Sequence, residues 1–250
     1  MTKRRMLLAV ASVALLAAGA VFAACGGDDD DSGSEPTTAA TKAAPTSAGV
    51  TGNGSPQSAL GKKINQAKIP EDLANGQAIG KADAKVVVEM YEDFGCPHCL
   101  DFTASIEPVL MDEYVATGKV QLVYRYFPLH QITAAAAIGA YCAGEQNQFW
   151  AYHRVLFIAQ AEANERKGPS LNQAFAPDSL KQFASDLKLD TAKFGDCISS
   201  DKAVSAVQAD LKSANDLNLP GTPSFVINGK VTDGPASAAE WRKLLDGLLK

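Results

Sequence analysis

The sequence lacks an excess of positive charge. Its 250 residues include 23 lysines and arginines against 28 aspartates and glutamates, which gives a formal net charge of -5. Three of the basic residues stand before residue 6, so the rest of the chain is more acidic still. A chain of this charge with no basic stripe is not expected to bind nucleic acid.

The sequence has few long apolar segments, and we interpret residues 6–20 as an apolar region too short for a comfortable membrane-spanning helix. Its main apolar run, residues 6–20, follows three basic residues, as in a secretory signal peptide. The residues that lead up to Cys25 resemble the lipobox of bacterial lipoproteins, whose cysteine is lipidated and becomes the N-terminus. We interpret residues 1–24 as a lipoprotein signal peptide and Cys25 as the lipidation site. The alternative is ordinary secretion, or a retained anchor, with a spare thiol at Cys25.

Large apolar residues are almost absent from residues 26–62, which consist mainly of small and polar residues. Such a segment cannot bury enough apolar surface to offset the entropy that it would lose on ordering. We predict that residues 25–62 form a disordered tether, in which the four acids at 28–31 are a solvated spacer and not a metal site. Residues 63–250 remain, which is ample for one hydrophobic core.

Cysteine is scarce, with five residues at positions 25, 96, 99, 142 and 197. If Cys25 carries lipid, four remain, and an exported chain lives where disulfides persist. Cys96 and Cys99 form a local pair, which leaves Cys142 and Cys197 for a structural disulfide. The alternative is that these last two are buried free thiols. No metal is expected, because zinc at the local pair would need two further ligands nearby.

Residues 96–99, with the sequence Cys-Pro-His-Cys, form the most informative motif of the chain. Two cysteines at this spacing can close a small disulfide ring and open it again. The apolar run before the motif predicts a buried strand, and residues 100–115 predict a helix, so Cys96 lies at a helix N-terminus. The partial positive charge there, about half an elementary charge, favours a thiolate. We therefore expect Cys96 to react in disulfide exchange near neutral pH.

The residues around the motif predict a parallel crossover unit. Residues 86–91 and 120–127 both read as buried strands, and strand, helix, strand at this spacing is typical of such a unit. Pro108 lies in the connecting helix and should kink or break it, because proline has no backbone N–H.

The rest of the chain divides into a helical block and a second pair of strands. The Asn-Gly pair at 228–229 predicts a hairpin, and Ser237 is placed to cap a last amphipathic helix. These final elements need a sheet to pack on, and the first two strands are the available one. We predict an α/β domain formed by residues 63–130 and 219–250, with residues 131–218 as an all-helical insertion.

This layout resembles the thioredoxin fold and, more narrowly, the DsbA-like thiol-disulfide oxidoreductases, here in a bacterial lipoprotein form. The resemblance covers about residues 75–250. Four blocks carry it, in the order found in that family: residues 93–99, 124–129, 149–153 and 221–225. A CxxC motif alone is far less specific than these four blocks together.

The resemblance implies roles for the residues of the motif. Cys96 is the exposed nucleophile or, in an oxidase, the sulfur that receives the attack. Cys99 is the buried partner that resolves the mixed disulfide. Pro97 and His98 stand between them, and a histidine at this position helps to stabilise the first thiolate in DsbA-like proteins. Stabilising that thiolate makes the disulfide a stronger oxidant.

The resemblance also implies a substrate-binding loop that faces the motif. Pro223 is expected to follow a cis peptide bond, which turns the backbone of Thr222 toward Cys96, where it can pair with a substrate strand. In this family the residue before that proline, here Thr222, tunes the reduction potential and the release of substrate.

One departure from the family concerns a buried acid. Thioredoxin-fold oxidoreductases often carry one six residues before the first cysteine, where this chain has Met90. Glu89 is one residue earlier, and strand alternation points it to the opposite face. Unless the strand carries a bulge, we expect no such proton acceptor for Cys99.

The resemblance implies an extracytoplasmic, lipid-anchored, monomeric enzyme of the cell envelope, with the redox-active Cys96–Cys99 disulfide and no other cofactor. It would donate disulfides to unfolded or reduced exported proteins. A membrane partner of the DsbB or vitamin K epoxide reductase type would reoxidise it. Two alternatives stay open: an extracytoplasmic reductase or isomerase, and a non-catalytic binding module in which the CxxC is a permanent disulfide.

Overall fold

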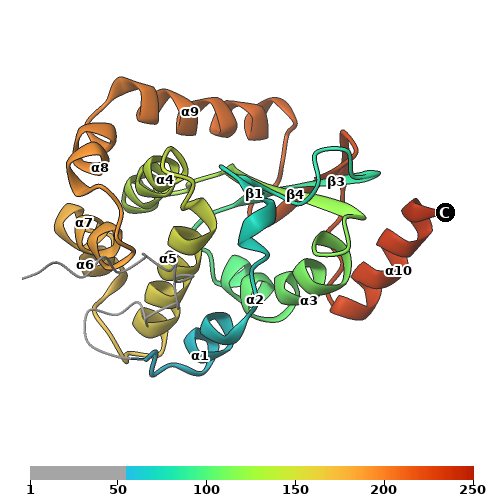
Figure 1. Cartoon of the computed structure of the whole chain (residues 1–250), viewed down its shortest axis with the longest axis horizontal. Helices are drawn as coiled ribbons and strands as arrows, with labels where there is room; N and C mark the ends of the chain where they lie inside the picture. The colour runs from blue at the N-terminus through green and yellow to red at the C-terminus, as the bar shows by residue number, and fades with distance from the viewer. Residues whose placement is uncertain (1–54) are drawn as a thin grey trace, which may run out of the picture. The chain divides into compact units, whose positions relative to one another are not determined.

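The computed structural model describes residues 55–250. The expected signal peptide, Cys25 and most of the expected tether lie outside the described residues. The described part is built on a six-stranded sheet of order β1-β2-β4-β3-β5-β6, with helices packed against it (Figure 1). None of the helices within residues 55–250 is long and apolar enough to cross a membrane.

The sheet is mixed. Its strands are β1 (Ala74–Asn75), β2 (Ala78–Ile79), β3 (Val86–Glu92), β4 (Val120–Tyr126), β5 (Ser224–Ile227) and β6 (Lys230–Thr232). β3 and β4 pair in parallel, as the crossover pattern predicts, and the other neighbouring strands pair antiparallel. β5 pairs with β3, so the C-terminal hairpin extends the sheet that the first two strands begin.

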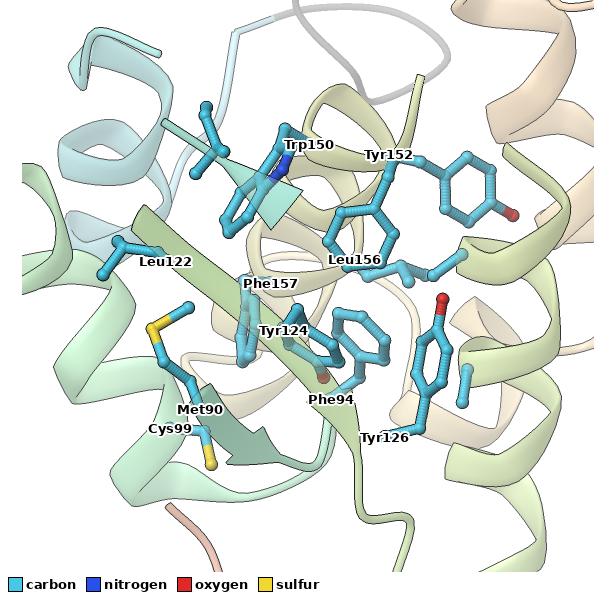
Figure 2. Packing of buried hydrophobic residues seen from close by; sticks show 14 of the residues in the cluster. Met90, Phe94, Cys99, Leu122, Tyr124, Tyr126, Trp150, Tyr152, Leu156 and Phe157 are labelled. Atoms are coloured by element: carbon cyan, nitrogen blue, oxygen red, sulfur yellow. The ribbon is translucent and has the colours of Figure 1, made fainter. Parts of the chain in front are cut away.

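The two central strands present alternate side chains to the two faces of the sheet. Val88 and Met90 of β3 and Leu122 and Tyr124 of β4 are fully buried in the main core. Figure 2 shows Met90, Leu122 and Tyr124 within this core. Tyr91 faces the other way, into a smaller cluster, and its hydroxyl lies 3.0 Å from Ser213 Oγ in α9 (Asp201–Asp216). Each face of β3 is therefore covered.

Most of the helices lie between β4 and β5 in the chain, as the predicted insertion requires. These are α4 (Gln131–Gly144), α5 (Phe149–Asn164), α6 (Leu171–Ala174), α7 (Pro177–Asp186), α8 (Thr191–Ile198) and α9. The helices outside this block are α1 (Ala59–Gln66), α2 (Pro97–Ser105), α3 (Glu107–Leu110) and α10 (Ala238–Leu249), with a 3-10 turn η1 (Glu71–Leu73) and a π-helical turn η2 (Met111–Val115).

A disulfide ties the insertion together. Cys142 of α4 and Cys197 of α8 are bonded, with their Cα atoms 5.7 Å apart and a sequence separation of 55. Cys142 is fully buried. The bond therefore links two helices of the block from the inside.

Three local signals have the predicted effect. The helix after the motif breaks at Ile106, between the end of α2 and the start of α3, where Pro108 occupies the first turn. Asn228 and Gly229 have φ angles of 49° and 78°, the left-handed values of a type I′ hairpin turn. The Ser237 side chain accepts a hydrogen bond from Glu240 N and caps α10.

The predicted tether extends too far toward the C-terminus. α1 begins at Ala59, and Ser58 caps it by accepting a hydrogen bond from Gly61 N. Ser58 is held in turn by Glu162 of α5, whose Oε1 accepts from Ser58 N and Ser58 Oγ, each at 2.7 Å. The prediction that residues up to 62 are disordered is wrong, because a distant acid supplies the anchor that local composition does not show.

Candidate active site

The CxxC motif begins at the carboxyl end of β3. Cys96 has extended backbone angles, φ -76° and ψ 122°, and is the N-cap residue of α2. Pro97 occupies the first helical position, where its fixed φ is favourable and its missing N–H costs nothing. The chain thus turns from strand to helix in the four residues 93–96, and Cys96 lies where the first backbone N–H groups of the helix are unpaired.

The loop before β5 closes over Cys96. The Thr222–Pro223 peptide bond is cis, and Cys96 Sγ donates to Thr222 O at 3.2 Å across 126 residues of sequence. The Thr222 hydroxyl has no hydrogen-bond partner among the described residues. It is therefore free to donate to a thiolate at Cys96.

The two sulfurs have opposite acid–base properties. The pKa of Cys96 is lowered to about 5, first by a hydrogen bond from the Cys99 thiol, then by the Thr222 side chain and the backbone amides of Cys99 and His98, while partial burial opposes the shift. The Cys99 side chain is fully buried, and desolvation is the main cause that raises its pKa well above that of a free thiol. The reduced pair thus holds one thiolate, on Cys96, and one thiol, on Cys99.

Pro97 and His98 are exposed in the first turn of α2. His98 contributes to the Cys96 thiolate through its backbone amide. A tuning role for the His98 imidazole, which the resemblance implies, stays a prediction.

Asp93 fixes the loop that carries the motif, and sequence reasoning assigned it no role. Its side chain is buried, with Oδ1 accepting from Gly95 N at 2.6 Å. Its Oδ2 accepts from Leu129 N at 2.6 Å and from Thr133 Oγ1 at 3.0 Å. Asp93 thereby joins the motif to the start of the helical insertion.

Gly95 is packed too closely to carry a side chain. A Cβ atom there would lie 2.6 Å from Cγ2 of Thr133, which α4 holds in place. The close approach of α4 to the loop therefore requires glycine directly before Cys96.

Substitution of Asp93 by alanine is expected to lower the free energy of unfolding by about 3 kcal/mol, because it leaves the backbone N–H groups of Gly95 and Leu129 without their acceptor. Urea denaturation would measure the loss. Asp101→Ala is the matched control, since Asp101 is exposed in α2 and should change stability by no more than about 0.5 kcal/mol. Equal stability of the two variants would contradict the role given to Asp93.

Position 90 carries no acid, but the structure places another buried acid near the motif, which the sequence analysis did not name. Glu89 does face away, as strand alternation predicts, and its carboxylate binds Arg125 at 2.5 Å. Glu92, however, is two residues after Met90 and so points to the same face of the sheet. It is only 1 % exposed, and its charge acts on Cys99. The sequence signal that could have revealed Glu92 is its spacing of two residues from Met90, which places both side chains on one face of the sheet.

The described residues contain no group of three or more His, Cys, Asp or Glu side chains arranged to hold a metal ion.

Comparisons with known proteins agree with this geometry. The sequence model of the thioredoxin family matches residues 72–247. The chain is 29% identical over 170 residues to the Na(+)/H(+) antiporter NhaA 3 of Salinispora tropica, and this match covers 67% of the chain but 24% of the antiporter. It is 29% identical over 160 residues to disulfide bond formation protein D of Bacillus anthracis, covering 63% of the chain and 71% of that protein.

Solved structures share the fold. The oxidised form of BdbD from Bacillus subtilis superposes with a TM-score of 0.61 at 22% identity, covering 70% of this chain and 93% of BdbD. The α-DsbA1 protein of Wolbachia pipientis gives 0.60 at 22% identity, covering 75% of this chain and 95% of that protein.

The chain belongs to the thioredoxin family, with a thioredoxin fold into which a block of helices is inserted. Within that family, the chain is similar to DsbA-like proteins such as BdbD and α-DsbA1, and to disulfide bond formation protein D. The chain spans about a quarter of the length of the antiporters that it matches.

Proposed function

We propose that this protein donates disulfides to reduced, unfolded proteins outside the cytoplasm. The observation that carries the proposal is the asymmetry of the two sulfurs. Cys96 is a half-buried thiolate with a pKa of about 5, and Cys99 is a buried thiol directly behind it. A pair that gains stability when reduced is a strong oxidant in its disulfide form.

The exchange proceeds in two balanced steps. A substrate thiolate attacks Cys96 Sγ, so that a mixed disulfide forms, the Cys96–Cys99 bond breaks and its electron pair leaves on Cys99. A second substrate thiolate then attacks the substrate sulfur and releases the Cys96 thiolate. The substrate gains a disulfide, and the Cys96–Cys99 pair gains two electrons.

The surface around Cys96 suits an unfolded substrate. The backbone carbonyl of Thr222 lies 3.2 Å from Cys96 Sγ, where an extended peptide can pair with the loop. Pro97 and Leu129 are exposed close to the motif, the latter at 49 %. These features provide backbone pairing and apolar contact without selecting one sequence.

We place the enzyme in the cell envelope, anchored through lipid on Cys25 and recycled by a membrane partner of the DsbB or vitamin K epoxide reductase type. The signal-like N-terminus supports export, and the Cys142–Cys197 disulfide suits an oxidising compartment. A DsbA-like protein that has oxidised one substrate needs such a partner, because the exchange leaves Cys96 and Cys99 reduced.

The test is the reduction potential of Cys96–Cys99, measured by equilibration with glutathione buffers and mass mapping of each cysteine pair. We expect a value more positive than about -200 mV. The margin by which this potential exceeds that of an ordinary dithiol should shrink as the pH falls. The lowered pKa of Cys96 stabilises the reduced form fully at pH values above the pKa of a free thiol, and this stabilisation is lost as the pH falls through about 5. A reduction potential of about -270 mV would indicate a reductase and would contradict the proposed role as a disulfide donor.

A further inference from the structure

The loop of residues 217–223 connects α9 to β5 and carries Thr222. We call it the Thr222 loop. Pro220 and Pro223 within it have no backbone N–H, so the loop has few donors with which to fix itself. Its Thr222 carbonyl nevertheless lies 3.2 Å from Cys96 Sγ. The elements at the two ends of the loop must therefore supply its position.

Each end of the Thr222 loop is tied to the element next to it. The Leu219 N–H donates to Ala214 O of α9 at 3.0 Å. The hydroxyl of Ser224, the first residue of β5, donates to Gly221 O at 2.6 Å. The position of the loop therefore follows from how α9 and β5 are placed relative to each other.

Tyr91 of β3 contacts both of these elements. Its backbone pairs with Ser224 in the antiparallel ladder of β3 and β5. Its hydroxyl lies 3.0 Å from Ser213 Oγ in the last turn of α9, where either group can donate. Tyr91 is 2 % exposed and belongs to the smaller cluster, which also contains Leu219. One residue thus ties both ends of the Thr222 loop to the strand that leads into Cys96.

The helix α9 is also fixed to the sheet one turn earlier, at Asp210. The Asp210 carboxylate is largely buried and accepts from Gln77 Nε2 and from Tyr126 N, each at 3.1 Å. Arg125 Nη1 donates to it at 3.3 Å. Asp210 and Ser213 have the (i, i+3) spacing of one helix face. Loss of the contact at Ser213 should therefore leave the body of α9 in place and loosen only its last turn and the loop.

We propose that Tyr91 and Ser213 are positioning residues that hold the Thr222 loop against Cys96. The inference rests on the proposed function, because it assigns these residues to the site of exchange. The Thr222 hydroxyl is buried and has no hydrogen-bond partner among the described residues. It can stabilise the Cys96 thiolate only while the loop stays in place. The contact between Tyr91 and Ser213 keeps the loop there before a substrate binds and after it leaves.

Removal of either hydroxyl changes no charge near the site. The ionisable groups that interact with Tyr91 or with Cys96 are Glu89, Glu92, Cys99, Arg125 and Asp210. Tyr91→Phe and Ser213→Ala leave all of them in place. A change in the acidity of Cys96 would therefore report a change in the position of the loop.

The test measures the acidity of Cys96 in the full chain, reduced with a phosphine. Wild type, Tyr91→Phe, Ser213→Ala and the double variant are alkylated with iodoacetamide from about pH 4 to about pH 9, and the modified Cys96 is quantified by mass. We expect each single variant to lower the acid dissociation constant of Cys96 about fivefold, the effect of one weakened hydrogen bond. The double variant should match the single variants, because both changes break the same contact.

The matched control is Tyr152→Phe. Tyr152 is buried in α5, and its hydroxyl donates to Leu180 O at 2.8 Å. The variant thus loses a buried tyrosine hydroxyl whose partner lies in the insertion and not in the Thr222 loop. Its Cys96 should have the same acid dissociation constant as in wild type.

An unchanged dissociation constant in both single variants would overturn the proposal, as would a wild-type Cys96 no more acidic than a free thiol. Additive effects in the double variant, or an equal effect in Tyr152→Phe, would indicate general loosening and would also overturn it. The alkylation requires no exchange with a substrate, so the reduction potential of the wild type decides the proposed function separately. Circular dichroism verifies folding, and Ser213→Ala carries the test if Tyr91→Phe does not fold.

Discussion

A Cys99→Ala variant is expected to accumulate covalent adducts with exported proteins when it is expressed in place of the wild type. Cys96 keeps a reactive position at the N-terminus of α2, next to the carbonyl of Thr222. Without Cys99, however, the mixed disulfide that forms at Cys96 has no internal thiol to resolve it. Non-reducing gels followed by mass spectrometry should show adducts that disappear on reduction.

The double variant Cys96→Ala/Cys99→Ala is the control, because it removes the attacking sulfur and retains the rest of the loop. It should form no adducts. Equal adduct levels in the single and double variants would mean that another thiol of the chain traps the partners. Absence of adducts in the single variant would show that Cys96 does not exchange with proteins.

Removal of the second disulfide, as Cys142→Ala/Cys197→Ala, is expected to lower the free energy of unfolding by about 4 kcal/mol. The bond closes a loop across 55 residues, and the chain-entropy estimate for a loop of this length gives that magnitude. Urea denaturation of both proteins with Cys96–Cys99 oxidised would measure the difference.

A second measurement on this variant, the reduction potential of Cys96–Cys99, serves as the control. If the bond acts only on the stability of the insertion, the reduction potential of Cys96–Cys99 should stay the same in the double alanine variant. A loss of stability below about 1 kcal/mol would contradict the structural role. A shifted potential would show that the insertion is coupled to the motif.

The sequence predicted the core of the sheet well, because its strands are strongly patterned. The apolar run at 86–91 became β3, and the run at 120–127 became β4, each within one residue at its end. Local chemistry also predicted the helix break near Pro108 and the turn at Asn228, since both depend on residues next to one another.

Features that depend on distant partners could not be predicted in the same way. β1 and β2 have two residues each, too few for a periodic signal, and they exist because β4 offers them an edge. α1 depends on Glu162, more than 100 residues away. Asp93 reads locally as a loop acid, and only the fold brings Leu129 and Thr133 to it.

The buried acid Glu92 was missed for a different reason, which is that the family pattern specifies a fixed position in the sequence. Family comparison directed attention to position 90, where the chain has methionine. Glu92 is a buried carboxyl group on the same face of β3, two residues further along the strand, and its charge acts on Cys99. Reasoning from alternation finds a residue that reasoning from a fixed position misses.

The insertion has a consequence for the order in which a newly made chain matures. Cys96 and Cys99 emerge during synthesis before Cys142, and Thr222 emerges last, because the helical block separates it from the motif by 126 residues. Cys96 and Cys99 are therefore present, without the Thr222 loop beside them, before Cys197 has been made to pair with Cys142. The loop that completes the site is made only just before the last strands, so no part of the substrate surface at Thr222 can form until the whole helical insertion has been synthesised.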